Sequence, residues 1–131
     1  MSYHIPSHLH DLPIYRKALD IFSLSRRISE YFSYDLSDLH HDGSEKTGIY
    51  FTGDIVQQSI SLAPEIAKAE EARFSDRKYK HVASLSRLTN LLYHTSYRLE
   101  RSHSHGKDYL PILRRELRKF KKLQRNWLLT L

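Results

Sequence analysis

The sequence predicts an all-α fold, an antiparallel up-down-up-down four-helix bundle that residues 1–131 form as a single domain. Four stretches repeat apolar residues every three or four positions, which is the spacing along one face of an α-helix. A length of 131 residues fits one domain. With only four glycines and four prolines, the chain is also poor in the turn residues that a β protein needs.

The first helix is expected over residues 12–34, with Asp11 as its N-cap and Pro13 in its first turn. Its core face is a series at alternating spacings of four and three: Ile14, Ala18, Ile21, Ser25, Ile28 and Phe32. Further apolar residues lie outside that series: Tyr15, Leu19, Phe22, Leu24 and Tyr31. Residues 1–10 are expected to be flexible, and the polar residues 35–48 to form a long loop before the second helix.

The second helix is expected over residues 52–72, and Pro64 lies inside it. Its repeating series is Ile55, Val56, Ser59, Ile60, Ala63, Ile66 and Ala67. An interior proline removes one backbone hydrogen bond and clashes with the preceding turn. Because the apolar period resumes in phase beyond Pro64, we expect a kink rather than a break.

The last two helices have recognisable starting signals. Ser75 is the expected N-cap of the third helix, which ends within residues 102–106. Its core series is His81, Leu85, Leu88, Leu92, Thr95 and Leu99. Asp108 is the expected cap of the fourth helix, with Pro111 in the first turn. The core series of this helix is Leu110, Leu113, Leu117, Phe120, Gln124 and Trp127.

Charge is unevenly distributed along the chain. Residues 1–65 hold five Lys or Arg against nine Asp or Glu, whereas the other half holds sixteen against six. The fourth helix concentrates seven cations in twelve residues, against the single acid Glu116: Arg114, Arg115, Arg118, Lys119, Lys121, Lys122 and Arg125. Many of them are four residues apart and repel one another. This pattern predicts a nucleic-acid-binding surface, and it also fits a solvated face or a contact with the acidic half of another subunit.

Other chemistry finds little support in the sequence. There is no cysteine, no glycine-rich phosphate loop and no nucleophile elbow. The nine histidines are scattered, and His81 and His94 lie alone on the third predicted helix, so no metal or cofactor is expected. No apolar run is long enough to span a bilayer, and the first ten residues do not resemble a secretory signal. We therefore expect a cytoplasmic protein that is not an enzyme.

Nine tyrosines exceed what one core buries with satisfied hydroxyl groups. Together with the broad apolar face of the first helix and the sequence Trp127-Leu128-Leu129, they would form an exposed patch on a monomer. These features predict an oligomer.

Several short motifs resemble one group of four-helix bundles. They are Leu12-Pro-Ile-Tyr15, Ser61-Leu-Ala-Pro-Glu-Ile-Ala-Lys-Ala69, Ser75-Asp76 with Tyr79, the stretch Leu88–Leu99, Asp108-Tyr109 and Trp127. The chain is similar in these motifs to the 23S rRNA intervening-sequence proteins and, more closely, to the accessory variability determinants of diversity-generating retroelements. It departs from them where Lys68-Ala69, Leu88-Thr89 and Arg125-Asn126 replace glycine-containing pairs.

The resemblance implies a barrel-like homopentamer without enzymatic activity. Its retroelement members work with a reverse transcriptase and its template RNA, so this chain is expected to be a basic accessory protein that binds RNA through the fourth helix. The alternative is a structural homo-oligomer of the intervening-sequence type that does not bind nucleic acid.

Overall fold

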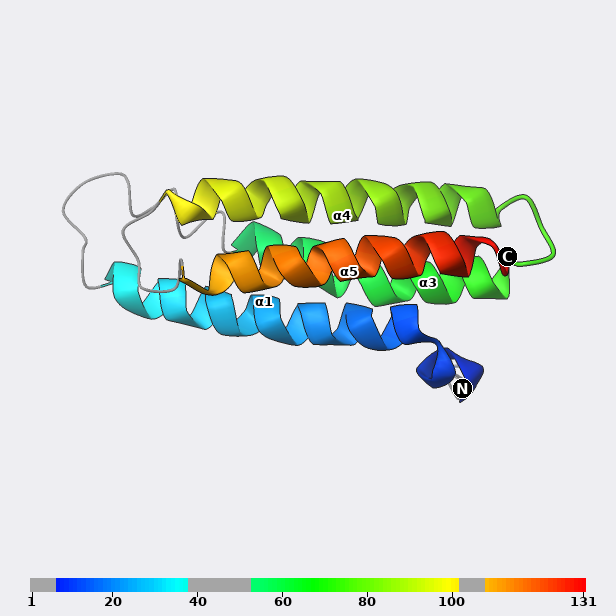
Figure 1. The fold of residues 1–131 in the computed structure, drawn as a ribbon, viewed down its shortest axis with the longest axis horizontal. Coiled ribbons are helices and arrows are strands. Elements are labelled where there is room, and N and C mark those ends of the chain that lie inside the picture. Colours follow the sequence, from blue (N-terminus) through cyan, green and yellow to red (C-terminus); the bar gives the residue numbers. More distant parts are fainter. Residues whose placement is uncertain (1–6, 38–52, 102–107) are drawn as a thin grey trace.

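The computed structural model describes residues 7–37, 53–101 and 108–131 (Figure 1). A short 3-10 helix, η1 (Ser7–Asp11), precedes four α-helices: α1 (Pro13–Ser37), α3 (Leu62–Glu71), α4 (Lys78–Glu100) and α5 (Leu110–Leu128). Residues 53–60 are also α-helical, and the described ranges contain no strand. The prediction of an all-α class is confirmed for these residues. None of the described helices combines the length and the apolar character that crossing a membrane would need.

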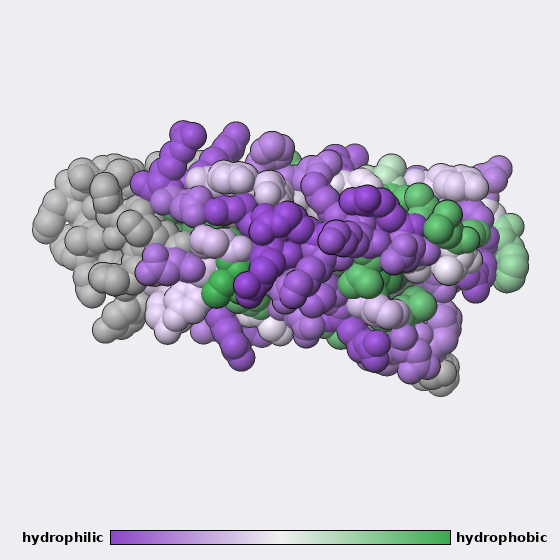
Figure 2. Space-filling view, in the orientation of Figure 1, coloured by the Kyte–Doolittle hydropathy of each residue, from purple (hydrophilic) through white to green (hydrophobic). Residues whose placement is uncertain are grey.

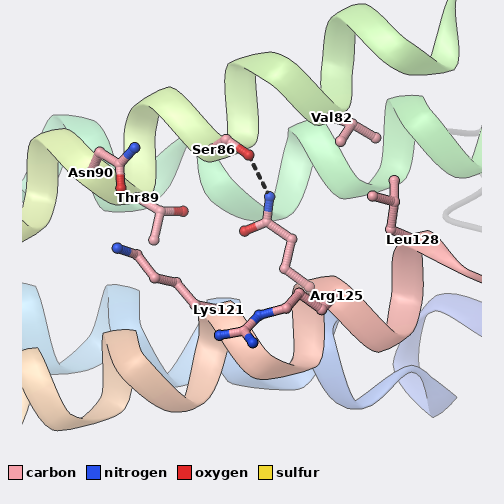
Figure 3. A pocket seen from close by; sticks show the side chains of 8 residues that line it. Val82, Ser86, Thr89, Asn90, Lys121, Arg125 and Leu128 are labelled. Carbon is pink, nitrogen blue, oxygen red and sulfur yellow. Dashed lines mark hydrogen bonds between the residues drawn. The ribbon is translucent and has the colours of Figure 1, made fainter.

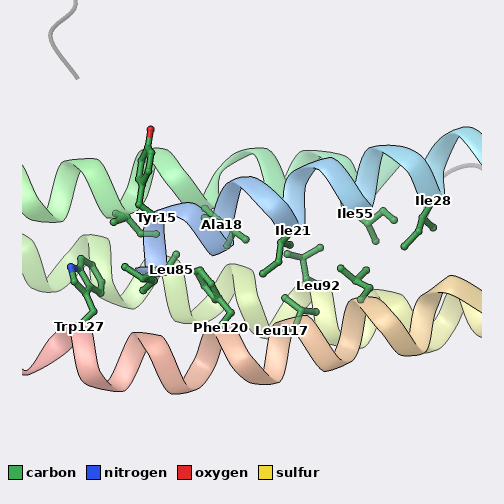
Figure 4. Close-up of a cluster of buried hydrophobic side chains, with 14 of the residues drawn as sticks. Tyr15, Ala18, Ile21, Ile28, Ile55, Leu85, Leu92, Leu117, Phe120 and Trp127 are labelled. Atoms are coloured by element: carbon green, nitrogen blue, oxygen red, sulfur yellow. The ribbon is translucent and has the colours of Figure 1, made fainter. Parts of the chain in front are cut away.

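The helices lie side by side around a shared apolar core (Figure 1). Helix α1 packs against α3 and α5, and α4 packs against the same two helices. Figure 4 shows buried side chains such as Ile21, Leu92 and Phe120 filling the space between the helices. All six residues predicted for the core face of α1 are buried, which confirms its amphipathic pattern.

The start of α1 differs from the prediction. The Leu12 carbonyl accepts hydrogen bonds from Tyr15 N and Arg16 N, while Leu12 N donates to Leu9 O at 3.0 Å. Asp11 therefore ends η1 instead of capping α1. The side chain of Leu9 is fully buried in the core. This burial explains why residues 7–10, which are expected to be flexible, form the 3-10 helix η1 together with Asp11. Residues 35–37 of the expected loop belong to α1, and its other residues lie outside the described ranges.

Residues 53–71 are helical except for the single turn residue Ser61, whose backbone stays in the right-handed helical region (φ −84°, ψ −11°), so the disturbance expected from Pro64 lies three residues before it. Pro64 lies in the first turn of α3. Because Pro64 has no N–H group, the carbonyl of Ile60 lacks its usual donor four residues later, and the helix is interrupted just after Ile60. The hydroxyl of Ser61 donates to Gln57 O at 3.1 Å and holds the two helical stretches together.

The remaining caps also lie elsewhere than predicted. The Ser75 hydroxyl accepts from Arg77 N at 3.2 Å and supports a turn of i to i+3 hydrogen bonds, so that α4 begins only at Lys78. Tyr109 occupies the N-cap position of α5 without a side-chain cap, because Asp108 lies in a short 3-10 turn. Pro111 is in the first turn of α5, as predicted.

The core face of α4 differs from the predicted series. Leu88 is only half-buried, whereas the small polar residues Thr89 and Ser96 are fully packed inside. Their hydroxyls donate within the helix, from Thr89 to Leu85 O at 2.7 Å and from Ser96 to Tyr93 O at 2.6 Å. Since these bonds satisfy the buried oxygens, Thr and Ser can replace apolar residues at the helix contacts.

Two other predicted core residues are half-buried polar contacts between helices. His81 Nδ1 donates to Glu65 Oε2 at 2.8 Å, and Gln124 Nε2 donates to Ser86 Oγ at 2.7 Å. Each lies at the edge of the apolar core, where a hydrogen bond to the neighbouring helix replaces full burial.

Candidate nucleic-acid interface

The structure divides the seven cations of α5 into two groups. Four lie on the flank that faces α4, and we call them the groove group: Arg114, Arg118, Lys121 and Arg125. Three are exposed and, among the described residues, form no hydrogen bond or ion pair with α4, and we call them the outer group: Arg115, Lys119 and Lys122. Because α5 buries its apolar face between α1 and α4, one sequence stretch supplies two different basic surfaces.

Arg114 is held inside the protein. Its residue exposure is 7%, and Nη2 donates to Glu100 Oε1 at 2.8 Å. The guanidinium carbon lies 4.2 Å from the centre of the Tyr97 ring, a cation–π contact. Arg114 therefore stabilises the packing of α5 on α4, and most of its charge is already neutralised by Glu100.

Arg118 and Lys121 both contact Tyr93 of α4. Arg118 Nη1 donates to the Tyr93 hydroxyl at 3.2 Å, and Lys121 Nζ lies 5.2 Å from the centre of the Tyr93 ring. The Tyr93 and Tyr97 rings meet edge to face with centroids 5.4 Å apart. Cations beside aromatic rings are typical of surfaces that bind unpaired nucleic acid, because bases stack on the rings and phosphates pair with the cations.

The two tyrosines have different acidities. The hydrogen bond between their hydroxyls lowers the pKa of Tyr93, and the hydrogen bond from Arg118 lowers it further. The same contact with Tyr93 raises the pKa of Tyr97. Tyr93 thus accepts hydrogen bonds, and its ring lies among cations rather than carboxylates.

An open cavity of about 340 Å³ lies between α4 and α5, and Lys121, which lines it, also contacts Tyr93. Figure 3 shows Lys121 and Arg125 of α5 opposite Asn90 and Ser86 of α4. We call this cavity the α4–α5 pocket, and its lining is Val82, Ser86, Thr89, Asn90, Lys121, Gln124, Arg125 and Leu128. None of these residues is acidic, so the pocket has a positive potential.

The outer group has one acidic neighbour among the described residues. Lys119 Nζ lies 3.3 Å from Glu116 Oε2, and Lys17 Nζ of α1 lies 3.4 Å from Glu116 Oε1. Burial of this carboxylate opposes its ionisation, but the two ammonium groups outweigh that effect and lower the pKa of Glu116. Arg115 and Lys122 have no carboxylate partner within the described ranges. Figure 2 shows hydrophilic side chains across the middle of one face of the molecule.

Sequence reasoning identified the basic helix but not its aromatic and amide neighbours on α4. Ser86, Asn90, Tyr93 and Tyr97 follow one another at spacings of four, three and four, which places them on one flank of a helix. This spacing predicts that the four residues share one flank of α4. Only the packing of α5 beside that flank shows that they adjoin the basic residues.

Among the residues that the structure describes, the histidines and carboxylates form no such cluster. His81 pairs with Glu65, and His8 Nε2 donates to Glu70 Oε1 at 3.2 Å. Over the described residues, no three His, Cys, Asp or Glu side chains converge as metal ligands would. His40, His41, His103 and His105 lie outside the described ranges.

Comparison with protein-family models, curated proteins and solved structures finds no match for this chain.

Proposed function

We propose that this protein is a non-enzymatic, basic accessory protein that binds RNA through α5 and the adjoining flank of α4. The observation that carries the proposal is the excess of unpaired positive charge on α5. Five of its seven cations have no carboxylate partner among the described residues: Arg115, Arg118, Lys121, Lys122 and Arg125. Like charges on one helix face repel, and phosphates that bind there relieve the repulsion.

The scaffold we propose is a single-domain bundle with up-down-up-down order. Its support is the path of the chain in Figure 1, which runs out along α1 and returns through residues 53–71, then runs out along α4 and returns along α5. In this order, α5 lies between α1 and α4 and presents its remaining surface to a partner.

Replacing Arg115, Lys119 and Lys122 with glutamine is expected to weaken RNA binding to a similar degree across unrelated sequences. Bound phosphates release counterions, so log affinity falls with log salt by about 0.7–0.9 for each phosphate contacted. The variant should make this slope shallower by about two or three for each subunit engaged. Filter binding at several salt concentrations measures both quantities, and thermal unfolding should show unchanged or slightly raised stability.

A matched control removes three charges elsewhere. Arg16, Arg26 and Arg27 are exposed on α1, and their replacement with glutamine gives the same net charge as the first variant. The control should retain most of the affinity. Equal losses in the two variants, or binding that does not depend on salt, would reject α5 as the RNA site.

The proposal includes assembly into a cyclic homo-oligomer of five subunits. A largely apolar cavity of about 370 Å³ between α1 and α3 supports an intersubunit contact. Leu19 and Ile60 both line this cavity, and they are 39% and 48% exposed. The apolar series of the second predicted helix includes Ile60, but Ile60 lies at the surface and not in the core. Phe74 is 99% exposed in the turn before α4. Sedimentation equilibrium at micromolar concentration should give a mass of about five chains, and a monomer would contradict the assembly.

The same apolar surface favours a second candidate function, a structural homo-oligomer in which the basic helix contacts the acidic half of a neighbouring subunit. Dissociation of the glutamine variant into monomers would favour this alternative. The proposed partnership with a retroelement reverse transcriptase in the cytoplasm is supported by the motif resemblance, and a reverse-transcriptase gene beside this one would add to that support.

A further inference from the structure

We infer that the α4–α5 pocket holds one unpaired nucleotide of a bound RNA strand, with its base between the two helices and its phosphate on Lys121 and Arg125. The inference rests on the proposed RNA binding and adds to it a specific subsite. It also adds a selectivity, because a base can enter the pocket only when it is neither paired nor stacked in a duplex.

The size of the pocket suits this ligand. Its volume of about 340 Å³ is at the lower end of the range for small-molecule sites, which is about 300–1,000 Å³. This hollow is open to solvent, and its volume is of the right order for a single nucleotide unit.

The lining provides each kind of contact that a nucleotide needs. Val82 and Leu128 form an apolar end for the flat face of a base. Asn90 is exposed, and its side-chain amide makes no hydrogen bond to other described residues, so both its donor and its acceptor are available for a base edge. Gln124 is oriented by the bond from Nε2 to Ser86 Oγ, which leaves Oε1 to accept a hydrogen bond from a base.

The charge of the pocket selects an anion. Lys121 and Arg125 line it without a carboxylate partner in the described residues, and no lining residue is acidic. Tyr93 lies just beyond Lys121, with its ring 5.2 Å from Nζ. A strand that leaves the pocket on this side therefore passes an aromatic ring, on which the next base can stack once Lys121 turns from the ring to a phosphate.

The test is a comparison of adenosine 5′-monophosphate with ribose 5-phosphate, which carries the same phosphate but no base. Both are titrated into the full-length protein while the side-chain amide resonances of Asn90 and Gln124 are followed by NMR. The nucleotide should bind about tenfold or more tightly than the sugar phosphate, since only the nucleotide offers a base to the apolar end of the pocket and to the Asn90 amide. The Asn90→Leu variant should lose most of that difference, whereas Asn126→Leu, the same change at an exposed position outside the pocket, should retain it.

Competition with RNA connects the pocket to the proposed function. Single-stranded RNA should displace the nucleotide from the pocket, and a blunt duplex of the same sequence should do so at least tenfold less effectively. Equal affinity for the nucleotide and the sugar phosphate, a preference that survives in Asn90→Leu, or equal competition by the duplex would each overturn the inference. Failure of the proposed function gives a different result. In that case RNA binding does not depend on salt, or it does not change when the outer group is replaced.

Discussion

Replacing Leu92 with alanine is expected to lower the free energy of unfolding by about 2–5 kcal/mol. Leu92 is fully buried near the middle of α4 and lies in the core with Ile21 and Leu117 (Figure 4). The smaller side chain loses the transfer free energy of its missing carbons and leaves a cavity that the surrounding helices fill only partly. Urea denaturation measures the change through the midpoint.

Leu88→Ala is the matched control on the same helix. The sequence pattern predicts a loss of about 2–5 kcal/mol at each of Leu88 and Leu92, but Leu88 is only half-buried and packs at the edge of the core. Its replacement should therefore cost less than Leu92→Ala, because less apolar surface is lost from the interior. Equal midpoints for the two variants would mean that the register of α4 in the core is wrong.

Replacing Trp127 with alanine should cost about 3–5 kcal/mol, the range for truncating a large buried aromatic residue. Trp127 is 5% exposed at the end of α5, and its Nε1 donates to Glu70 Oε2 at 2.9 Å. Glu70 is itself buried on α3, so this hydrogen bond joins two helices through a charged acceptor. Thermal or urea unfolding gives the loss.

Trp127→Phe separates the hydrogen bond from the packing. Phenylalanine retains an aromatic ring but cannot donate to Glu70, and a buried acceptor that loses its donor costs about 1–3 kcal/mol. His8 still donates to the other oxygen of Glu70. In a Glu70→Gln background, the cost of Trp127→Phe should change, because the two side chains are in contact. Additive effects of the two substitutions would show that the negative charge of Glu70 adds nothing to the hydrogen bond, because the glutamine oxygen can still accept from Trp127 Nε1.

The cations of the candidate site can be predicted from the sequence alone, but their contacts with α4 cannot. The concentration of cations in α5 was evident from spacing alone, because residues three and four apart share a helix face. The pattern did not separate Arg114 from the others, since its burial depends on Glu100 and Tyr97 of another helix. It also did not indicate that Asn90 and Tyr93 lie beside Lys121, because that proximity results from the packing of α5 on α4.

The sequence by itself determined the helical class and the buried face of α1, because apolar periodicity reports directly on which side of a helix avoids water. It also located the basic character of α5. The tertiary structure alone decided the burial of Thr89 in place of Leu88 on α4 and the burial of Arg114 on α5. These features depend on hydrogen bonds and contacts between segments distant in the chain, where a buried hydroxyl is acceptable once its own helix satisfies it and an arginine can be buried once a carboxylate pairs with it.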